Sequence, residues 1–148
     1  NWDEYLRVPF WEDLDYIGID AYFPLSEEKT PSVEQLQEGW QRWKKDIAAL
    51  SEKTGRPVLF TEFGYRSMDF TAHKPWLVDR NEDDVNLDAQ VNAKKAIFME
   101  FWDEDWFAGG YVWKWFIDHK KSGGEKDNRF TPQNKPAQEI IKEVYKSH

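Results

Sequence analysis

The chain has 148 residues, a formal net charge of −8 and no cysteine. The acidic surplus argues against nucleic acid as a partner, because phosphate binding needs clustered Lys and Arg, and the lack of cysteine excludes disulfides and thiolate metal sites. Residues 1–148 form one segment with the length of a single domain. No apolar run reaches the roughly 18 to 20 residues of a membrane span.

The predicted elements alternate between strand and helix from the start of the chain. After a helical approach that closes at 11–14, a first strand is expected over 16–23, where Pro24 ends it. A helix follows, with Thr30 as its N-cap and Pro31 at its first position. Its apolar residues recur at steps of three and four until Gly55, so one stripe of this helix can cover a sheet face.

The second predicted strand runs over 57–62, where Val58, Leu59 and Phe60 form the continuous apolar run that is typical of a buried parallel strand. The remaining elements are, in order, an irregular stretch over 64–86, a helix over 87–102, a third strand over 111–116, a second irregular stretch over 117–135 and a helix from Pro136. The irregular stretches follow strands, whereas the helix-to-strand connection at Gly55 is short. Long loops at the carboxyl ends of parallel strands are usually functional.

This alternation predicts an α/β fold with three parallel strands joined by right-handed crossovers. Three strands cannot close a barrel, and a full (βα)8 barrel takes about 250 residues, so we expect a partial TIM (β/α)8 barrel made of about the last three βα units. A short doubly wound sheet is the alternative. Such a sheet usually carries a glycine-rich phosphate turn after its first strand, and residues 22–25 contain no glycine.

Glu62 is the catalytic candidate that placement alone suggests. Its apolar strand runs directly into the carboxylate and then into Gly64, and in α/β folds the carboxyl ends of parallel strands are where ligands bind. The simpler interpretation is an ordinary carboxylate at the end of a strand. Nine Trp, ten Phe and six Tyr are more rings than the core of such a segment needs. Surplus Trp is typical of sugar-binding clefts, although any single Trp is more often part of the core.

Several stretches resemble one known family in combination: residues 14–25, residues 57–67 with their Thr-Glu-Phe-Gly-Tyr-Arg core, Gln90 on the following helix, and residues 109–115. They are similar to the last three strands of glycoside hydrolase family 113, a (βα)8-barrel group of β-mannanase-like enzymes in glycoside hydrolase clan A. The resemblance spans nearly the whole chain. It implies the C-terminal part of a catalytic domain.

The resemblance also implies roles for particular residues. Glu62 matches the nucleophile at the end of strand seven, Tyr22 matches the tyrosine that hydrogen-bonds the nucleophile, and Trp113 matches the tryptophan under the sugar at the cleavage point. Asn1 and Trp2 match the end of strand five, so Trp2 is a candidate for substrate contact. The acid/base glutamate of the family lies upstream of these residues, and we therefore expect the chain to be inactive by itself.

Further site candidates come from the residues near these motifs. Asp20 precedes Tyr22 by two positions and shares its strand face, so it is expected to line or support the site at most, and a buried carboxylate with its own hydrogen-bond partners is the preferred interpretation. Tyr65 and Arg66 follow Glu62, and either side chain could contact a sugar hydroxyl, although a solvent-facing Arg66 is the preferred interpretation. His73, His119 and His148 show no ligand spacing, so no metal and no cofactor is expected.

Taken together, the sequence predicts the C-terminal part of a retaining β-glycoside hydrolase of the endo-β-1,4-mannanase kind, acting on β-mannan or a related glycan. A non-catalytic carbohydrate-binding module is the alternative, and a segment that carries scaffold alone is the third interpretation. An open three-stranded sheet leaves an unpaired edge, so the isolated chain is expected to self-associate. No targeting segment is evident, which leaves the compartment open, including secretion or the cell surface.

Overall fold

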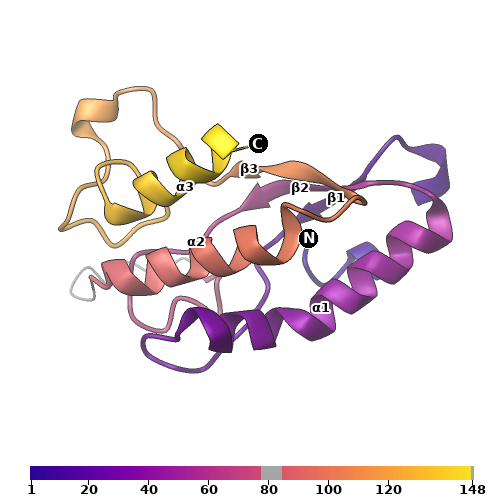
Figure 1. The fold of residues 1–148 in the computed structure, drawn as a ribbon, viewed down its shortest axis with the longest axis horizontal. Helices are drawn as coiled ribbons and strands as arrows, with labels where there is room; N and C mark the ends of the chain where they lie inside the picture. Colours follow the sequence, from indigo (N-terminus) through magenta and orange to yellow (C-terminus); the bar gives the residue numbers. More distant parts are fainter. Residues whose placement is uncertain (78–84, 148) are drawn as a thin grey trace.

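The structure is a computed structural model that describes residues 1–77 and 85–147, and its centre is a parallel sheet (Figure 1). Within the described residues the sheet has three strands in the order β1-β2-β3, which are β1 Ile17–Asp20, β2 Val58–Phe63 and β3 Phe107–Val112. β2 pairs in parallel with both neighbours. The fold class predicted from the alternation of strands and helices is therefore confirmed.

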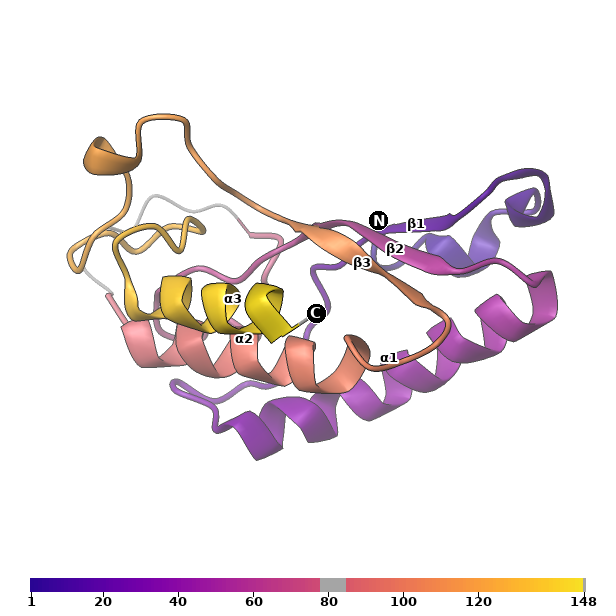
Figure 2. The same ribbon diagram turned by 45° about the horizontal axis from the view of Figure 1, so that its top comes forward.

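The helices lie on one side of this sheet (Figure 2). These are the α-helices α1 Val33–Thr54, α2 Leu87–Phe101 and α3 Pro136–Ser147. The described residues also form the short 3-10 helices η1 Tyr5–Arg7, η2 Trp11–Asp13 and η3 His119–Lys121. α2 packs against both α1 and α3. Among the described residues, no helix is both long enough and apolar enough to cross a membrane.

The core lies between the sheet and the helices. On β1 and β2 the side chains of Ile19, Val58 and Phe60 are fully buried on the helix side, and Trp40 of α1 packs its ring against Phe60. The opposite face of β2 carries the exposed Thr61. One face of the sheet is thus covered by helices and the other is open, which is the arrangement of adjacent strands in a barrel wall.

The N-terminus of α1 lies two residues later than predicted. Ser32 is the N-cap, its side chain accepts a hydrogen bond from the Gln35 backbone, and the Gln35 side chain accepts one from the Ser32 backbone. This capping box satisfies two backbone donors, so it fixes the helix start more firmly than the Thr30-Pro31 pair. β1 is also shorter than predicted, because its register with β2 shifts between Ile19 and Asp20.

β3 lies four residues earlier than predicted, at Phe107–Val112 in place of 111–116. We expected Gly109 and Gly110 to precede the strand, but both lie inside it. A Cβ on Gly110 would lie 3.0 Å from the Cβ of Phe60 and 3.0 Å from the Phe63 ring, so glycine is needed where the strands pack this closely. In consequence Trp113 and Trp115 follow the strand and do not alternate along it.

Lys94 on α2 is a charged residue that sits in this core. Its side chain is fully buried, its Nζ has no hydrogen-bond partner among the described residues, and it lies 4.3 Å from the centre of the Phe63 ring. Burial lowers the pKa of Lys94 to about 7. A lysine in the unfolded chain titrates at about 10.4. Between these two values the unfolded state binds more protons, so stability increases as pH rises through this window.

We therefore expect Lys94→Met to raise the free energy of unfolding at neutral pH by on the order of a few kcal/mol, because it removes the cost of the buried amine. The gain over the unmodified chain should be largest at pH 7 and below and should shrink toward pH 10. Urea unfolding followed by Trp fluorescence at several pH values measures it. Lys95→Met, at the exposed neighbouring position, is the matched control, and a gain that does not change with pH would contradict this account.

Candidate active site

The candidate site lies at the carboxyl ends of the three strands, where the chain leaves the sheet for long irregular segments. Figure 1 shows these segments gathered at the end of the sheet that faces the N-terminus of α2. The loop after β2 contacts the segment after β1, since Leu25 N donates to Ala72 O and Phe70 N donates to Lys29 O. Residues 78–84 of the predicted stretch 64–86 lie outside the described residues.

Glu62 and Tyr22 meet at this end of the sheet. Glu62 is the second-last residue of β2 and is half-buried, and Tyr22 lies just past β1. The Tyr22 hydroxyl donates a hydrogen bond to Glu62 Oε2 at 2.7 Å. The backbone supports this pairing, because Ala21 N donates to Glu62 O at 2.7 Å. Two neighbouring strand ends therefore hold the carboxylate and its hydroxyl partner in fixed positions.

Asp20 supplies a second carboxylate beside this pair. It accepts a hydrogen bond from Thr61 Oγ1 at 2.8 Å, so it has a partner of its own. Burial, the hydrogen bond to Glu62 and the negative charges of Glu62 and Asp20 together raise the pKa of Tyr22 well above its ordinary value. Tyr22 thus keeps its proton across the physiological range and acts as a donor.

Trp113 lies beside the residue that follows the end of β2. Its backbone N donates to Phe63 O at 2.8 Å, and its side chain is 39% exposed. A Cβ on Gly64 would lie 2.2 Å from Trp113 O, so only glycine allows the two backbones to approach this closely. The Glu-Phe-Gly sequence at the end of β2 therefore brings the Trp113 backbone against the residues that follow Glu62. Trp115 lies further out, half exposed and stacked on His119.

Trp2 belongs to an aromatic cluster near the end of β1. Its ring stacks on Trp76 with centroids 4.8 Å apart, and it makes edge contacts with Phe23 and Trp43. Trp76 is 41% exposed. Trp2 is half-buried among these aromatic neighbours. Trp40 is fully buried, as the helix stripe predicts.

Two expectations about the residues after Glu62 are corrected by their burial. Tyr65 is fully buried and its hydroxyl donates to Phe23 O at 3.0 Å, so the side chain points into the core and does not reach a ligand site. Arg66, expected to face solvent, is 4% exposed and donates to Asn128 O and Asn128 Oδ1. Arg66 is held by Asn128 of the segment after β3, whereas Tyr65 belongs to the hydrophobic core.

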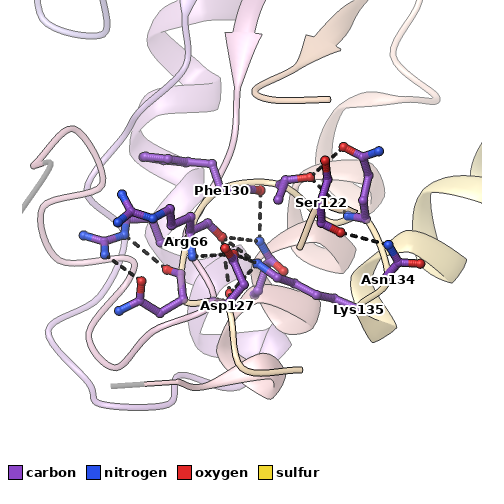
Figure 3. A network of polar contacts seen from close by, with 12 residues as sticks. Arg66, Ser122, Asp127, Phe130, Asn134 and Lys135 are labelled. Atoms are coloured by element: carbon purple, nitrogen blue, oxygen red, sulfur yellow. Dashed lines mark hydrogen bonds and ion pairs between the residues drawn. The ribbon is translucent and has the colours of Figure 1, made fainter. Parts of the chain in front are cut away.

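The segment after β3 is held against residues 65–67 by a network of polar contacts that the sequence did not reveal (Figure 3). Lys135 has a fully buried side chain, and its Nζ donates to Ser67 Oγ at 2.8 Å, to Asp127 Oδ1 at 2.6 Å and to Arg129 O at 2.9 Å. Gln90 of α2 donates to Tyr65 O at 2.9 Å. Polar residues in a segment predicted to be an irregular loop gave no signal of this burial. Gln90 alone stood out, through the resemblance.

The described residues contain no group of three or more His, Cys, Asp or Glu side chains that could hold a metal ion. His73 lies on the loop after β2 and His119 begins η3, and His148 lies outside the described residues. The candidate site is therefore built from a carboxylate, a phenol and exposed indole rings. Such groups can carry out nucleophilic chemistry and stack on sugar rings without requiring a metal.

Comparison with known proteins is consistent with this geometry. The family model of Glycoside Hydrolase Family 113 matches residues 1–135. The search of curated proteins finds no match.

Solved structures match the chain over nearly all of its length. One is described as the structure of a GH113 β-1,4-mannanase, with 25% identity and a TM-score of 0.74, covering 99% of this chain and 43% of that one. Another is the GH113 β-mannanase AaManA from Alicyclobacillus acidocaldarius in complex with ManMIm, with 24% identity and a TM-score of 0.76, covering 97% and 42%. A β-glucuronidase from Faecalibacterium prausnitzii matches at 14% identity with a TM-score of 0.56, covering 97% and 24%.

This chain therefore spans about two-fifths of the length of the β-mannanase structures that it matches. The match to a family model over 135 of 148 residues nevertheless decides its membership. The chain belongs to glycoside hydrolase family 113.

Proposed function

We propose that this chain carries the nucleophile side of a retaining β-glycosidase site of the endo-β-1,4-mannanase kind, with Glu62 as the nucleophile. The observation that carries the proposal is the hydrogen bond of 2.7 Å from the Tyr22 hydroxyl to Glu62 Oε2. It joins the ends of two neighbouring strands, where active sites of (βα)8 enzymes lie. Such a bond stabilises negative charge on the carboxylate and aims it.

In the proposed reaction Glu62 attacks the anomeric carbon of the bound sugar, and the bond from that carbon to the leaving oxygen breaks. A covalent glycosyl-enzyme intermediate forms, and water then releases it. Tyr22 keeps its proton and orients the carboxylate throughout. Trp113 is proposed as the platform for the sugar ring, and Asp20 with Thr61 supports the floor of the site. Trp2 is proposed to contact the glycan from its aromatic cluster.

A retaining site needs a second carboxyl about 5 to 5.5 Å from the first, to protonate the leaving oxygen and later to activate water. Asp20 is already bonded to Thr61 and is proposed as support only. We propose that the acid/base glutamate lies upstream of Asn1, as the resemblance implies. Hydrolysis of an unactivated mannan by residues 1–148 alone should then be negligible, because general acid catalysis typically contributes factors of about 10² to 10⁴.

The proposed substrate is a β-mannan or a related β-glycan. Support comes from the family match and from the solved β-1,4-mannanases, one of which is described in complex with ManMIm. The net charge of −8 accords with a neutral glycan. A non-catalytic carbohydrate-binding module would use the same indole rings but has no need of a hydroxyl aimed at a carboxylate.

The nucleophile is tested separately from the acid by using a donor with an activated leaving group. A dinitrophenyl β-mannobioside that carries fluorine at C2 loses dinitrophenolate without protonation, and its glycosyl-enzyme turns over slowly. We expect the chain to release dinitrophenolate in step with a gain of one fluoro-mannobiosyl group by intact mass spectrometry. Glu62→Gln should lower this rate by roughly a thousandfold or more, since the attacking oxygen is lost. Tyr22→Phe should lower it by roughly tenfold.

Asp118→Asn is the matched control, because this carboxylate is exposed and lies in the loop after β3. It should label at the rate of the unmodified chain. Labelling that persists in Glu62→Gln would contradict the assignment. Binding of manno-oligosaccharide that survives Glu62→Gln, with no labelling of the unmodified chain, would favour the binding module.

We also propose that the isolated chain self-associates through the outer edges of its sheet. In the described part of the chain β1 and β3 pair with β2 only, so each leaves one edge without a strand partner. Tyr111 of β3 and Trp115 just past it are exposed, and with Ile141 and Tyr145 of α3 they line an apolar groove. Apolar surface and an open edge together favour pairing with another chain.

Sedimentation velocity over a range from submicromolar to tens of micromolar concentration measures this association. We expect the average mass to increase with concentration. Tyr111→Lys places a charge at the exposed edge and should lower the associated fraction, whereas Tyr16→Lys, at an exposed tyrosine before β1, should lower it less. A monomer at every concentration would show that the sheet edges do not mediate association.

A further inference from the structure

Phe130 is a buried ring beside the candidate nucleophile that no motif pointed to. It lies in the segment between η3 and α3, and its side chain is 8% exposed. Its ring meets the Tyr22 ring edge to face, with centroids 6.0 Å apart and an interplanar angle of 74°. Its Cδ1 lies 3.4 Å from the position that a Cβ on Gly64 would occupy. Phe130 therefore fills the space between Tyr22 and the residues that follow β2.

The backbone of Phe130 is tied directly to the continuation of β2. The Gln90 side chain donates to Phe130 O at 3.0 Å and to Tyr65 O at 2.9 Å, so a single amide bridges the two segments. Figure 3 shows this bond reaching the Phe130 carbonyl. Gln90 is fully buried on α2. Tyr65 lies three residues after Glu62, so the bridge sets the position of Phe130 relative to the strand that carries the carboxylate.

A second tie holds the residues just before Phe130. Ser67 Oγ donates to Asp127 O at 2.6 Å, and Ser67 N donates to Arg129 O at 3.3 Å. The buried Lys135 amine donates to Ser67 Oγ and pairs with Asp127, which closes the network around the same backbone. A buried polar network whose members are bonded in this way is rigid and favours one arrangement. Residues 127–130 are thus held in register with residues 65–67.

We propose that Phe130 is a positioning residue, which holds the Tyr22 ring so that its hydroxyl stays on Glu62 Oε2, and that Gln90 and Lys135 hold Phe130 in place. The inference rests on the proposed function in so far as Glu62 is the nucleophile. Phe130 is buried behind Tyr22, so it acts through Tyr22 and has no direct part in binding sugar. Its loss should slow the attack by Glu62 while leaving the affinity for the donor unchanged.

The first test follows Tyr22 itself and needs no turnover. The chain is labelled with fluorotyrosine, and the Tyr22 resonance is assigned by its loss in Tyr22→Phe. Because burial is the largest cause of the raised pKa of Tyr22, Phe130→Leu should shift this resonance and let it titrate at a lower pH. Phe98→Leu is the matched control, since Phe98 is 4% exposed and packs on Phe63 and Trp102. It should leave the Tyr22 resonance unchanged.

The second test uses the covalent labelling by the dinitrophenyl donor in a double-mutant cycle. Phe130→Leu should lower the maximal labelling rate by roughly tenfold, with the half-saturating donor concentration within about twofold of the unmodified chain. In the Tyr22→Phe background Phe130→Leu should have no further effect, because the bond that it protects is already gone. Circular dichroism and urea unfolding confirm that each variant is folded.

Additive effects of the two substitutions, or a Tyr22 resonance that responds equally to Phe98→Leu, would overturn the positioning role. Different results would exclude Glu62 as the nucleophile and Phe130 as a positioning residue. Labelling that does not depend on Glu62 would remove the proposed nucleophile, and the fluorine resonance would still decide whether Phe130 positions Tyr22. An unchanged resonance in Phe130→Leu would remove the positioning role and leave the nucleophile standing.

Discussion

The double pairing of β2 is the constraint on which the rest of the structure depends. β2 is hydrogen-bonded to β1 on one side and to β3 on the other, and its helix-facing side chains pack in the core with those of α1 and α2. A strand fixed in this way has almost no freedom at its carboxyl end, so Glu62 projects from a rigid support. Tyr22 follows the end of the neighbouring β1 and bonds Glu62 through its hydroxyl, and the backbone of Trp113, just past β3, bonds the last residue of β2.

The loops contribute a second layer of order. The segment after β3 returns over the continuation of β2, where it bonds the buried Arg66 and brings Phe130 against Tyr22. Lys135 and Gln90 anchor it with charge-assisted and amide hydrogen bonds that are shielded from water. The result is a continuous line of contact from a buried polar network to the Tyr22 hydroxyl. Lys94 differs from Lys135, because its buried Nζ has no hydrogen-bond partner among the described residues.

The parts of the fold that could be predicted from sequence were those set by local patterns. Apolar periodicity located α1, α2, α3 and the second strand, and the carboxylate before Gly64 marked the end of that strand. β3 was misplaced because its glycines serve close packing against Phe60, which no local pattern reveals. Arg66 was misjudged for a related reason, because it bonds Asn128 in a segment some sixty residues later in the chain. Tyr65 was misjudged because its ring packs in the core and its hydroxyl bonds Phe23 O. Tyr22 was found through the family resemblance, since a tyrosine after a strand is not distinctive by itself.

The central claim is that a carboxylate oxygen of Glu62 forms the covalent bond to the sugar, and that Tyr22 holds this carboxylate in place. The most direct measurement is to label the chain with the fluorinated donor, digest it with protease and sequence the modified peptide by tandem mass spectrometry. The account predicts one fluoro-mannobiosyl ester, on the Glu62 side chain. An ester on Asp20 or on a carboxylate away from the strand ends would contradict it.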